Sequence, residues 1–210
     1  KKDRWRIKGR QFTAGEWLRN TPPSATNADA IKPSAVVMDN GTVVLGWHQF
    51  EEGKPSQVKL CRLKGAEWMD LKDPGARTHD GFRVELLAAK GSVWAFWDQY
   101  SDRHNSVLGR PVFPTAGPLE RISPPTPATE RCLKPVPMYS ATEGLCVGWL
   151  KLTDVIGGDG VIDMFHTAHV SRRVDGKWRL VDDGKAGTAG AVMMNGLLPD
   201  LRKGKGYPSG

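Results

Sequence analysis

The chain carries the segment G-T-V-V-L-G-W at Gly41–Trp47 and repeats its form as G-S-V-W-A-F-W at Gly91–Trp97 and G-L-C-V-G-W at Gly144–Trp149. The three closing tryptophans are spaced 50 and 52 residues apart. Each copy starts at Gly and continues with apolar residues, many of them β-branched or aromatic, which favour strands. A period of about 50 residues built from short strands is typical of the blades of a β-propeller.

A second marker recurs at nearly the same spacing. It is a Gly-led segment that closes each unit, found at Gly15–Leu18, Gly65–Met69, Gly117–Glu120 and Gly176–Leu180. Because two markers share one period, each unit is predicted to be one blade of four antiparallel strands. We therefore expect an all-β propeller in a single domain over 1–210, with complete blades at about 33–72, 82–122 and 134–182.

Turn signals divide each unit into its strands. Asp39-Asn40-Gly41 marks a hairpin between the first two strands of the first unit. The predicted strands of that unit are Ser34–Asp39, Thr42–Gln49, Gln57–Lys64 and Glu67–Lys72. No stretch of ten or more residues carries the 3.6-residue period of a helix, so helices are not expected.

Both ends of the sequence look like partial blades, at 4–19 and 188–200. These halves either pair with each other and close a four-bladed ring, or belong to an arc cut from a six- or seven-bladed propeller. Closure would satisfy the edge strands that an arc leaves open. A first residue other than Met favours the arc.

Composition limits the classes of function. The chain has 210 residues, 39% of them hydrophobic, and a net charge of +7. It has no apolar run long enough to predict a membrane span, and none of the known nucleic-acid-binding patterns. Three cysteines form no disulfide framework and are expected to be buried and unpaired. The compartment stays open, with export slightly favoured.

Basic residues alternate along the N-terminal segment, as Arg4, Arg6, Lys8 and Arg10. This period of two indicates a half-exposed strand with its basic side outward. The segment is either a solvated strand face or a patch for phosphate or an acidic polysaccharide.

The repeated tryptophans Trp47, Trp97 and Trp149 also have two explanations. A large ring on the second strand of a blade would fill the wedge between neighbouring blades, so we expect these side chains in the core. The alternative is a platform on which a sugar ring stacks.

Cations recur where the innermost strands are expected to begin, at Lys32-Pro33, Phe82-Arg83 and Lys134-Pro135. If these starts meet at one axial opening, Lys32, Arg83 and Lys134 converge and can hold a carboxylate or sulfate by charge-assisted hydrogen bonds. Arg103 and Arg131, from a predicted loop and a segment between blades, are further candidate ligand-binding residues. The alternative is that each cation reaches solvent independently.

The segment G-F-R-V-E-L-L-A-A-K-G-S-V-W-A-F-W (Gly81–Trp97) resembles the sialidase-like propellers, whose units are BNR-type repeats. The segment Trp97–Ser106 is similar to the W-D-x-Y-x-D-x-x-N pattern of bacterial propeller repeats in the same broad group. The resemblance implies the propeller architecture and, at Arg83, a contact to a substrate carboxylate. Glu85 stands where the family has Pro, and the family's Asp-box has no counterpart here.

Candidate catalytic residues gather after the second core tryptophan. Asp98 and Asp102 offer two carboxyls of the kind that glycoside hydrolysis requires across a cleft. Tyr100 and His104 offer acid–base groups suited to a lyase that acts on a uronic acid. An ordinary polar loop explains the same residues without catalysis.

The sequence also contains one candidate metal site. Asp154, Asp159 and Asp163 surround Gly157–Gly160, and calcium favours clustered carboxylates. The Gly-Asp-Gly within this segment is also an ordinary hairpin tip. No other cofactor is expected.

These features favour a propeller that binds an anionic or polyhydroxyl, carbohydrate-type ligand at its axial face. One alternative is a part of a glycan-active enzyme, either a glycoside hydrolase or a polysaccharide lyase. The other is a protein-interaction scaffold. An exposed aromatic ring beside the cationic opening is expected of a carbohydrate binder, and a broad apolar face is expected of a scaffold.

Overall fold

The structure is a computed structural model that describes residues 4–22, 27–75, 78–156 and 162–181. Every regular element in these ranges is a β-strand. No helix that could cross a membrane is found among them. The prediction of an all-β chain is therefore confirmed for the described residues.

The strands form one two-stranded sheet and three four-stranded antiparallel sheets, in which neighbouring strands follow one another along the chain. The two-stranded sheet is β1 (Arg10–Thr13) with β2 (Glu16–Arg19). Blade 1 consists of β3 (Asp29–Val37), β4 (Val43–Phe50), β5 (Gln57–Lys64) and β6 (Glu67–Asp70). Blade 2 consists of β7 (Asp80–Ala89), β8 (Ser92–Ser101), β9 (His104–Phe113) and β10 (Glu120–Arg121). Blade 3 consists of β11 (Glu130–Ser140), β12 (Gly144–Ile156), β13 (Ile162–Val174) and β14 (Lys177–Leu180).

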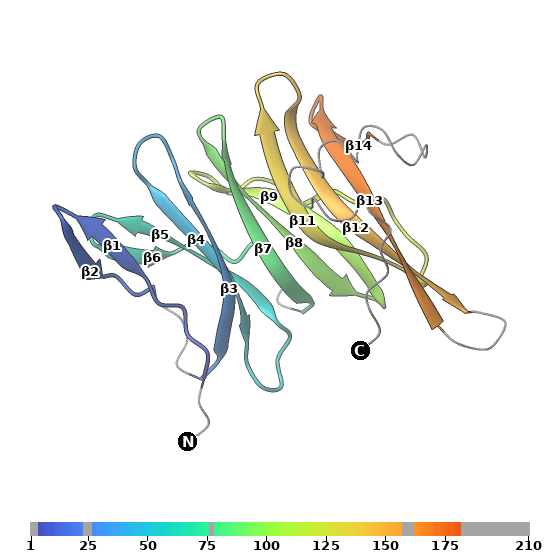
Figure 1. Cartoon of the computed structure of the whole chain (residues 1–210), viewed down its shortest axis with the longest axis horizontal. Helices are drawn as coiled ribbons and strands as arrows, with labels where there is room; N and C mark the ends of the chain where they lie inside the picture. Colours follow the sequence, from blue (N-terminus) through green and yellow to red (C-terminus); the bar gives the residue numbers. More distant parts are fainter. Residues whose placement is uncertain (1–3, 23–26, 76–77, 157–161, 182–210) are drawn as a thin grey trace, which may run out of the picture.

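The sheets lie side by side in a row, and the first strands β3, β7 and β11 are next to one another (Figure 1). Within the described residues the sheets remain separate and do not close into a ring. The predicted closing partner at 188–200 lies outside the described residues. The predicted three complete blades are thus present, and ring closure stays a prediction.

The first strand of each blade begins earlier than the sequence predicted. β3 starts at Asp29 rather than Ser34, and β11 starts at Glu130 rather than Val136. The prediction was wrong because it placed the strand starts at Lys32-Pro33, Phe82-Arg83 and Lys134-Pro135, where the strands form a bulge and do not begin. The strands instead pass through these dipeptides by means of a bulge, with paired residues on both sides.

The bulge is the same in all three blades. In each bulge, two residues of the first strand lie opposite a single residue of the second strand. These pairs of residues are Lys32-Pro33, Arg83-Val84 and Lys134-Pro135. The φ angles of Lys32, Arg83 and Lys134 are 51°, 49° and 57°, in the left-handed region. A bulge bends its strand and redirects the side chain that it carries. The three predicted cations therefore occupy equivalent positions.

The residue opposite each bulge is the repeated tryptophan. Trp47, Trp97 and Trp149 are almost fully buried. Trp97 lies in the cluster between blades 1 and 2, and Trp149 lies with Trp94 and Phe96 between blades 2 and 3. The prediction that these rings form the core is confirmed, and the sugar-stacking alternative is wrong for all three. The three cysteines are free and buried, as expected.

The N-terminal segment packs on blade 1 as blade 1 packs on blade 2. The Trp5 N–H donates to Asp29 Oδ1 at 2.7 Å, and the Ser56 N–H donates to Asp80 Oδ1 at 2.6 Å. The return bonds run from Ala30 N to the Trp5 carbonyl and from Gly81 N to the Ser56 carbonyl. Residues 4–19 thus occupy the place of a preceding blade, although only 10–13 and 16–19 are strands.

Candidate functional site at the bulged end of the blades

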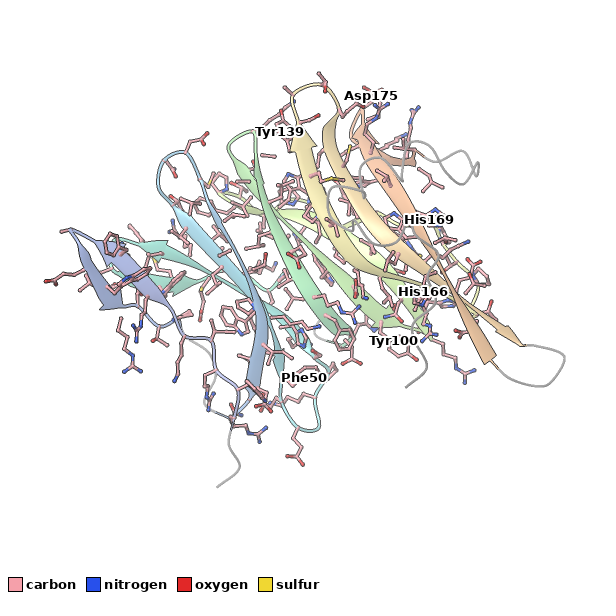
Figure 2. The ribbon with its side chains drawn as sticks, viewed as in Figure 1. Phe50, Tyr100, Tyr139, His166, His169 and Asp175 are labelled. Atoms are coloured by element: carbon pink, nitrogen blue, oxygen red, sulfur yellow. The ribbon has the colours of Figure 1, made fainter. Side chains whose placement is uncertain are left out.

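The site lies at the end of the blades where β4 and β8 finish. Figure 2 shows Phe50 and Tyr100 at this end and Tyr139 and Asp175 at the opposite end. The bulges bring Lys32, Arg83 and Lys134 to this region, because each lies opposite the tryptophan that precedes the last residues of the second strand. We call this region the axial site, and its centre is Asp98.

Asp98 links two blades through its side chain. It follows Trp97 on β8, so it faces blade 3, on the opposite side of the sheet from Trp97. Its Oδ1 accepts the backbone N–H of Lys134 at 2.7 Å, and its Oδ2 accepts Arg83 Nη1 at 3.3 Å. The Asp98 side chain is 1% exposed, whereas that of Arg83 is 35% exposed. The buried Asp98 carboxyl therefore fixes the Arg83 guanidinium, which is itself partly exposed at the surface.

Burial raises the pKa of Asp98 to about 7. The charge of Arg83, the Lys134 N–H and the charge of Lys32 act in the opposite direction, and they only partly offset the loss of hydration. A carboxyl with a pKa near 7 exchanges its proton at neutral pH, which is the property that acid–base catalysis requires.

His48 occupies the position of Asp98 in blade 1, since each follows a core tryptophan. Both ring nitrogens of His48 are buried, and neither has a hydrogen-bond partner within the described part of the chain. Burial, together with the nearby charges of Lys32 and Arg83, lowers its pKa to about 4. The imidazole is therefore neutral at physiological pH. It packs edge-on against Phe50 and Phe82, with ring centroids 4.6 and 5.8 Å away.

Two exposed aromatic side chains lie at the same end of the molecule as the axial site (Figure 2). Phe50 is 38% exposed and lines a groove together with Lys32 and Pro33. Tyr100 is also exposed, at the end of β8. The sequence criterion for a carbohydrate binder, an exposed aromatic ring beside the cations, is met by Phe50 next to Lys32.

The other predicted catalytic residues lie toward the tip of the β8–β9 hairpin. Asp102 and Arg103 form its two-residue turn, both with positive φ, and both are exposed. Tyr100 pairs with Asn105, and His104 begins β9. Asp102 is four residues beyond Asp98 along the hairpin, a separation of about 13 Å at roughly 3.3 Å per residue. The structure therefore groups Asp102, Arg103, Tyr100 and His104 at the rim and places Asp98 beneath the axial site.

Arg131 and two of the predicted calcium ligands, Asp154 and Asp163, belong to strands of blade 3. Arg131 Nη2 donates to Asp154 Oδ1 at 2.6 Å, so Asp154 is engaged in an ion pair. Asp159 lies outside the described residues, and the placement of the Asp163 side chain is not described. Among the residues that the structure does describe, no three potential ligands cluster for a metal ion. The calcium site stays a prediction.

Sequence reasoning missed two features of this region. The first is the place of His48 in the site, since the predicted strand Thr42–Gln49 contains this residue but it was not among the candidate site residues. The three core tryptophans are followed by His48, Asp98 and Leu150. Comparing these three residues would have shown that His48 and Asp98 occupy equivalent positions in their blades. The second is the backbone N–H of Lys134, a partner of Asp98 that no side-chain pattern announces.

Neither a family model nor a curated protein matches this chain. Solved structures do match. One is the α-L-arabinanase of Penicillium chrysogenum complexed with arabinobiose, with a TM-score of 0.53 and 10% identity over 88% of this chain and 62% of that one. Another is the GH93 α-L-arabinofuranosidase of Fusarium graminearum with arabinobiose, with a TM-score of 0.51 and 8% identity over 79% of this chain and 54% of that one.

These structural neighbours are β-propeller glycoside hydrolases. At such low identity the match concerns the fold alone, and this chain spans less than two thirds of the length of either enzyme. The propeller prediction is therefore supported by an independent comparison. The sialidase-type resemblance stays a prediction.

Proposed function

We propose that this chain forms the glycan-recognising part of a propeller-type, glycan-active enzyme, and that the axial site binds the ligand. The observation that carries the proposal is the Arg83–Asp98 pair. A half-exposed guanidinium is held in place by a buried carboxyl, which is itself fixed by the Lys134 N–H of the next blade. A pre-positioned guanidinium loses little freedom when it binds a carboxylate in a bidentate manner.

The surroundings of Arg83 support an acidic sugar as the ligand. Lys32 and Lys134 stand at the equivalent bulges of the two neighbouring blades and add positive charge. Phe50 and Tyr100 expose ring surface at the same end of the molecule (Figure 2). Cations for a carboxylate and rings for the sugar faces together fit a uronic acid better than a neutral pentose.

The fold matches support the enzymatic side of the proposal, because both enzymes named above are complexed with arabinobiose in their structures. Asp98, whose pKa is about 7, is the candidate for proton exchange. Because the buried Asp98 carboxyl is hydrogen-bonded to Arg83, its expected role is to position the guanidinium. The protonation state of Asp98 is then expected to control how strongly it holds Arg83, which stays charged. In a longer propeller, a second carboxyl would come from other blades.

The test is a binding titration of the chain with digalacturonate and with arabinobiose, comparing wild type with Arg83→Gln. Wild type is expected to bind digalacturonate in preference to arabinobiose. Arg83→Gln is expected to weaken digalacturonate binding about tenfold or more, since a hydrogen bond to a charged group contributes about 1.5–3 kcal/mol. Arg179→Gln, an exposed arginine on β14, is the matched control and should bind as wild type.

The same samples are assayed for release of reducing ends or of unsaturated uronate from polygalacturonate, which separates a hydrolase from a lyase. The proposal fails if neither disaccharide binds at millimolar concentration. It also fails if Arg83→Gln binds digalacturonate as tightly as wild type.

A further inference from the structure

An open groove of about 760 Å³ lies between the N-terminal segment and β3. Side chains from both sides line it, including Trp5, Arg6, Lys8, Asp29, Lys32 and Phe50. The groove exists because residues 4–9 pack on blade 1 through the backbone of Trp5, which bonds to Asp29 and Ala30. Its floor is therefore built from backbone pairing between the N-terminal segment and β3.

The groove is positively charged. Arg6, Lys8 and Lys32 line it, and Asp29 is the one acidic residue among the lining residues that the structure describes. The Asp29 carboxylate accepts the Trp5 N–H at 2.7 Å and Arg4 Nη1 at 3.2 Å, and these contacts hold its pKa below the usual value. Asp29 is thus already neutralised by its neighbours. The remaining charge favours an anionic occupant.

Exposed aromatic rings stand within the same groove. Trp5 is 74% exposed and Phe50 is 38% exposed. Since Trp5 holds blade 1 through its backbone N–H and carbonyl, its ring has no part in that attachment. Aromatic rings next to cations fit a chain of acidic sugars, in which apolar sugar faces alternate with carboxylates. A neutral glycan would use the rings and gain little from the cations.

Lys32 joins this groove to the axial site. It lines the groove, and its charge also lowers the pKa values of both His48 and Asp98. Phe50 likewise faces the groove and packs against His48 and Phe82 beside Arg83. The two sites are therefore continuous across the boundary of the first two blades.

We propose that the groove is an extended subsite for an acidic polysaccharide, in which successive uronate units run from Arg83 past Lys32 and Phe50 to Trp5 and Lys8. This inference rests on the proposed function of the axial site and adds that the ligand is a polymer rather than a disaccharide. Long oligouronates should consequently bind more tightly than short ones.

The experiment measures dissociation constants for digalacturonate and hexagalacturonate by calorimetry, together with quenching of tryptophan fluorescence. Wild type is expected to bind the hexamer at least tenfold more tightly than the dimer. Trp5→Ala and Lys8→Gln are each expected to weaken hexamer binding severalfold and to leave dimer binding unchanged. Tyr139→Ala and Lys177→Gln are controls from exposed positions outside the groove and should change neither.

A neutral ligand tests the chemical class. Arabinohexaose should bind little more tightly than arabinobiose, because it carries no carboxylate for the cations. If the dimer binds but the hexamer binds no more tightly, or if Trp5→Ala and Lys8→Gln bind the hexamer as wild type, the groove proposal is overturned and the axial site stands. If the dimer itself does not bind, both are overturned.

Discussion

His48 and Asp98 occupy equivalent positions in blades 1 and 2, and their pKa values are shifted in opposite directions. Burial raises the pKa of Asp98 from 3.8 to about 7 and lowers the pKa of His48 from 6.5 to about 4. Both groups therefore favour the neutral form when folded, because removal from water penalises a charge of either sign. The charge of Arg83 acts on both, since it stabilises the Asp98 carboxylate and disfavours the His48 cation.

These two shifts predict opposing effects of pH on stability. Between about pH 4 and 7 the folded chain keeps the Asp98 proton that the unfolded chain loses, so this group makes the fold less stable as pH rises. Between about pH 6.5 and 4 the unfolded chain takes up a proton on His48 that the folded chain refuses, so this group makes the fold less stable as pH falls. In wild type these two opposing changes in the free energy of unfolding with pH largely cancel.

Substituting either residue should reveal the pH dependence of stability that the other residue causes. Asp98→Asn leaves the His48 effect, so its free energy of unfolding should increase from pH 4 to 6.5, by up to about 3 kcal/mol at roughly 1.4 kcal/mol per pKa unit. His48→Leu leaves the Asp98 effect and should lose stability as pH rises from 4 to 7. Leu fits this position in blade 3 as Leu150. Urea unfolding at several pH values measures both, and curves parallel to wild type would refute the linkage.

At the scale of the element, the repeated bulge is the device that builds the axial site. Each bulge carries a cation at a left-handed residue and sits opposite a core tryptophan. A non-glycine residue in this region costs about 1–2 kcal/mol. The same strained position in three blades is consistent with a functional demand for the side chain, because Gly would be the more stable choice.

Replacing Lys134 by Gly should separate stability from binding. Gly keeps the N–H that Asp98 accepts, relieves the left-handed strain and is expected to raise the free energy of unfolding by about 0.5–1 kcal/mol after its own entropy cost. The lost charge should weaken digalacturonate binding severalfold. Lys90→Gly is the control, since Lys90 has a φ of 50° in an exposed hairpin turn. It should gain stability by a similar amount with no effect on binding, and a loss of stability in Lys134→Gly would contradict this account.

At the scale of the whole molecule, the blades are held together by rings and by paired backbone groups between neighbouring sheets. Trp97 fills the boundary between blades 1 and 2, where Val44, Val58, Leu60 and Val84 surround it. The Asp80–Ser56 and Asp29–Trp5 hydrogen bonds tie successive sheets at the axial end. The axial site therefore depends on the spacing of blades that no single sheet determines.

Substituting Trp97 by Ala should disturb both the core and the site. The expected loss is about 3–5 kcal/mol in the free energy of unfolding, as for other buried aromatic residues. Trp17→Ala, at an exposed tryptophan on β2, should cost less than about 1 kcal/mol. Thermal and urea unfolding compare the two. Equal losses would mean that the repeated tryptophan is not the wedge between the blades.

The sequence alone determined the repeat and its consequences. The positions of Trp47, Trp97 and Trp149, the glycine turns and the alternating strands predicted four-stranded blades and buried rings, because side-chain periodicity and turn chemistry act locally. The equivalence of Lys32, Arg83 and Lys134 also followed from their common spacing. The starts of β3, β7 and β11 did not, because the pairing of residues before each bulge is set by the second strand of the blade and not by a local pattern.

Only the tertiary structure decided what surrounds these residues. Three features depend on contacts between neighbouring blades or between blade 1 and the N-terminal segment: Asp98 accepts the Lys134 backbone N–H, the His48 ring is buried against Phe82 with no hydrogen-bond partner among the described residues, and Trp5 and Phe50 share a groove. Such contacts join residues far apart in the chain, and the free energy of burying a charge depends on every neighbour at once. No local pattern carries that information.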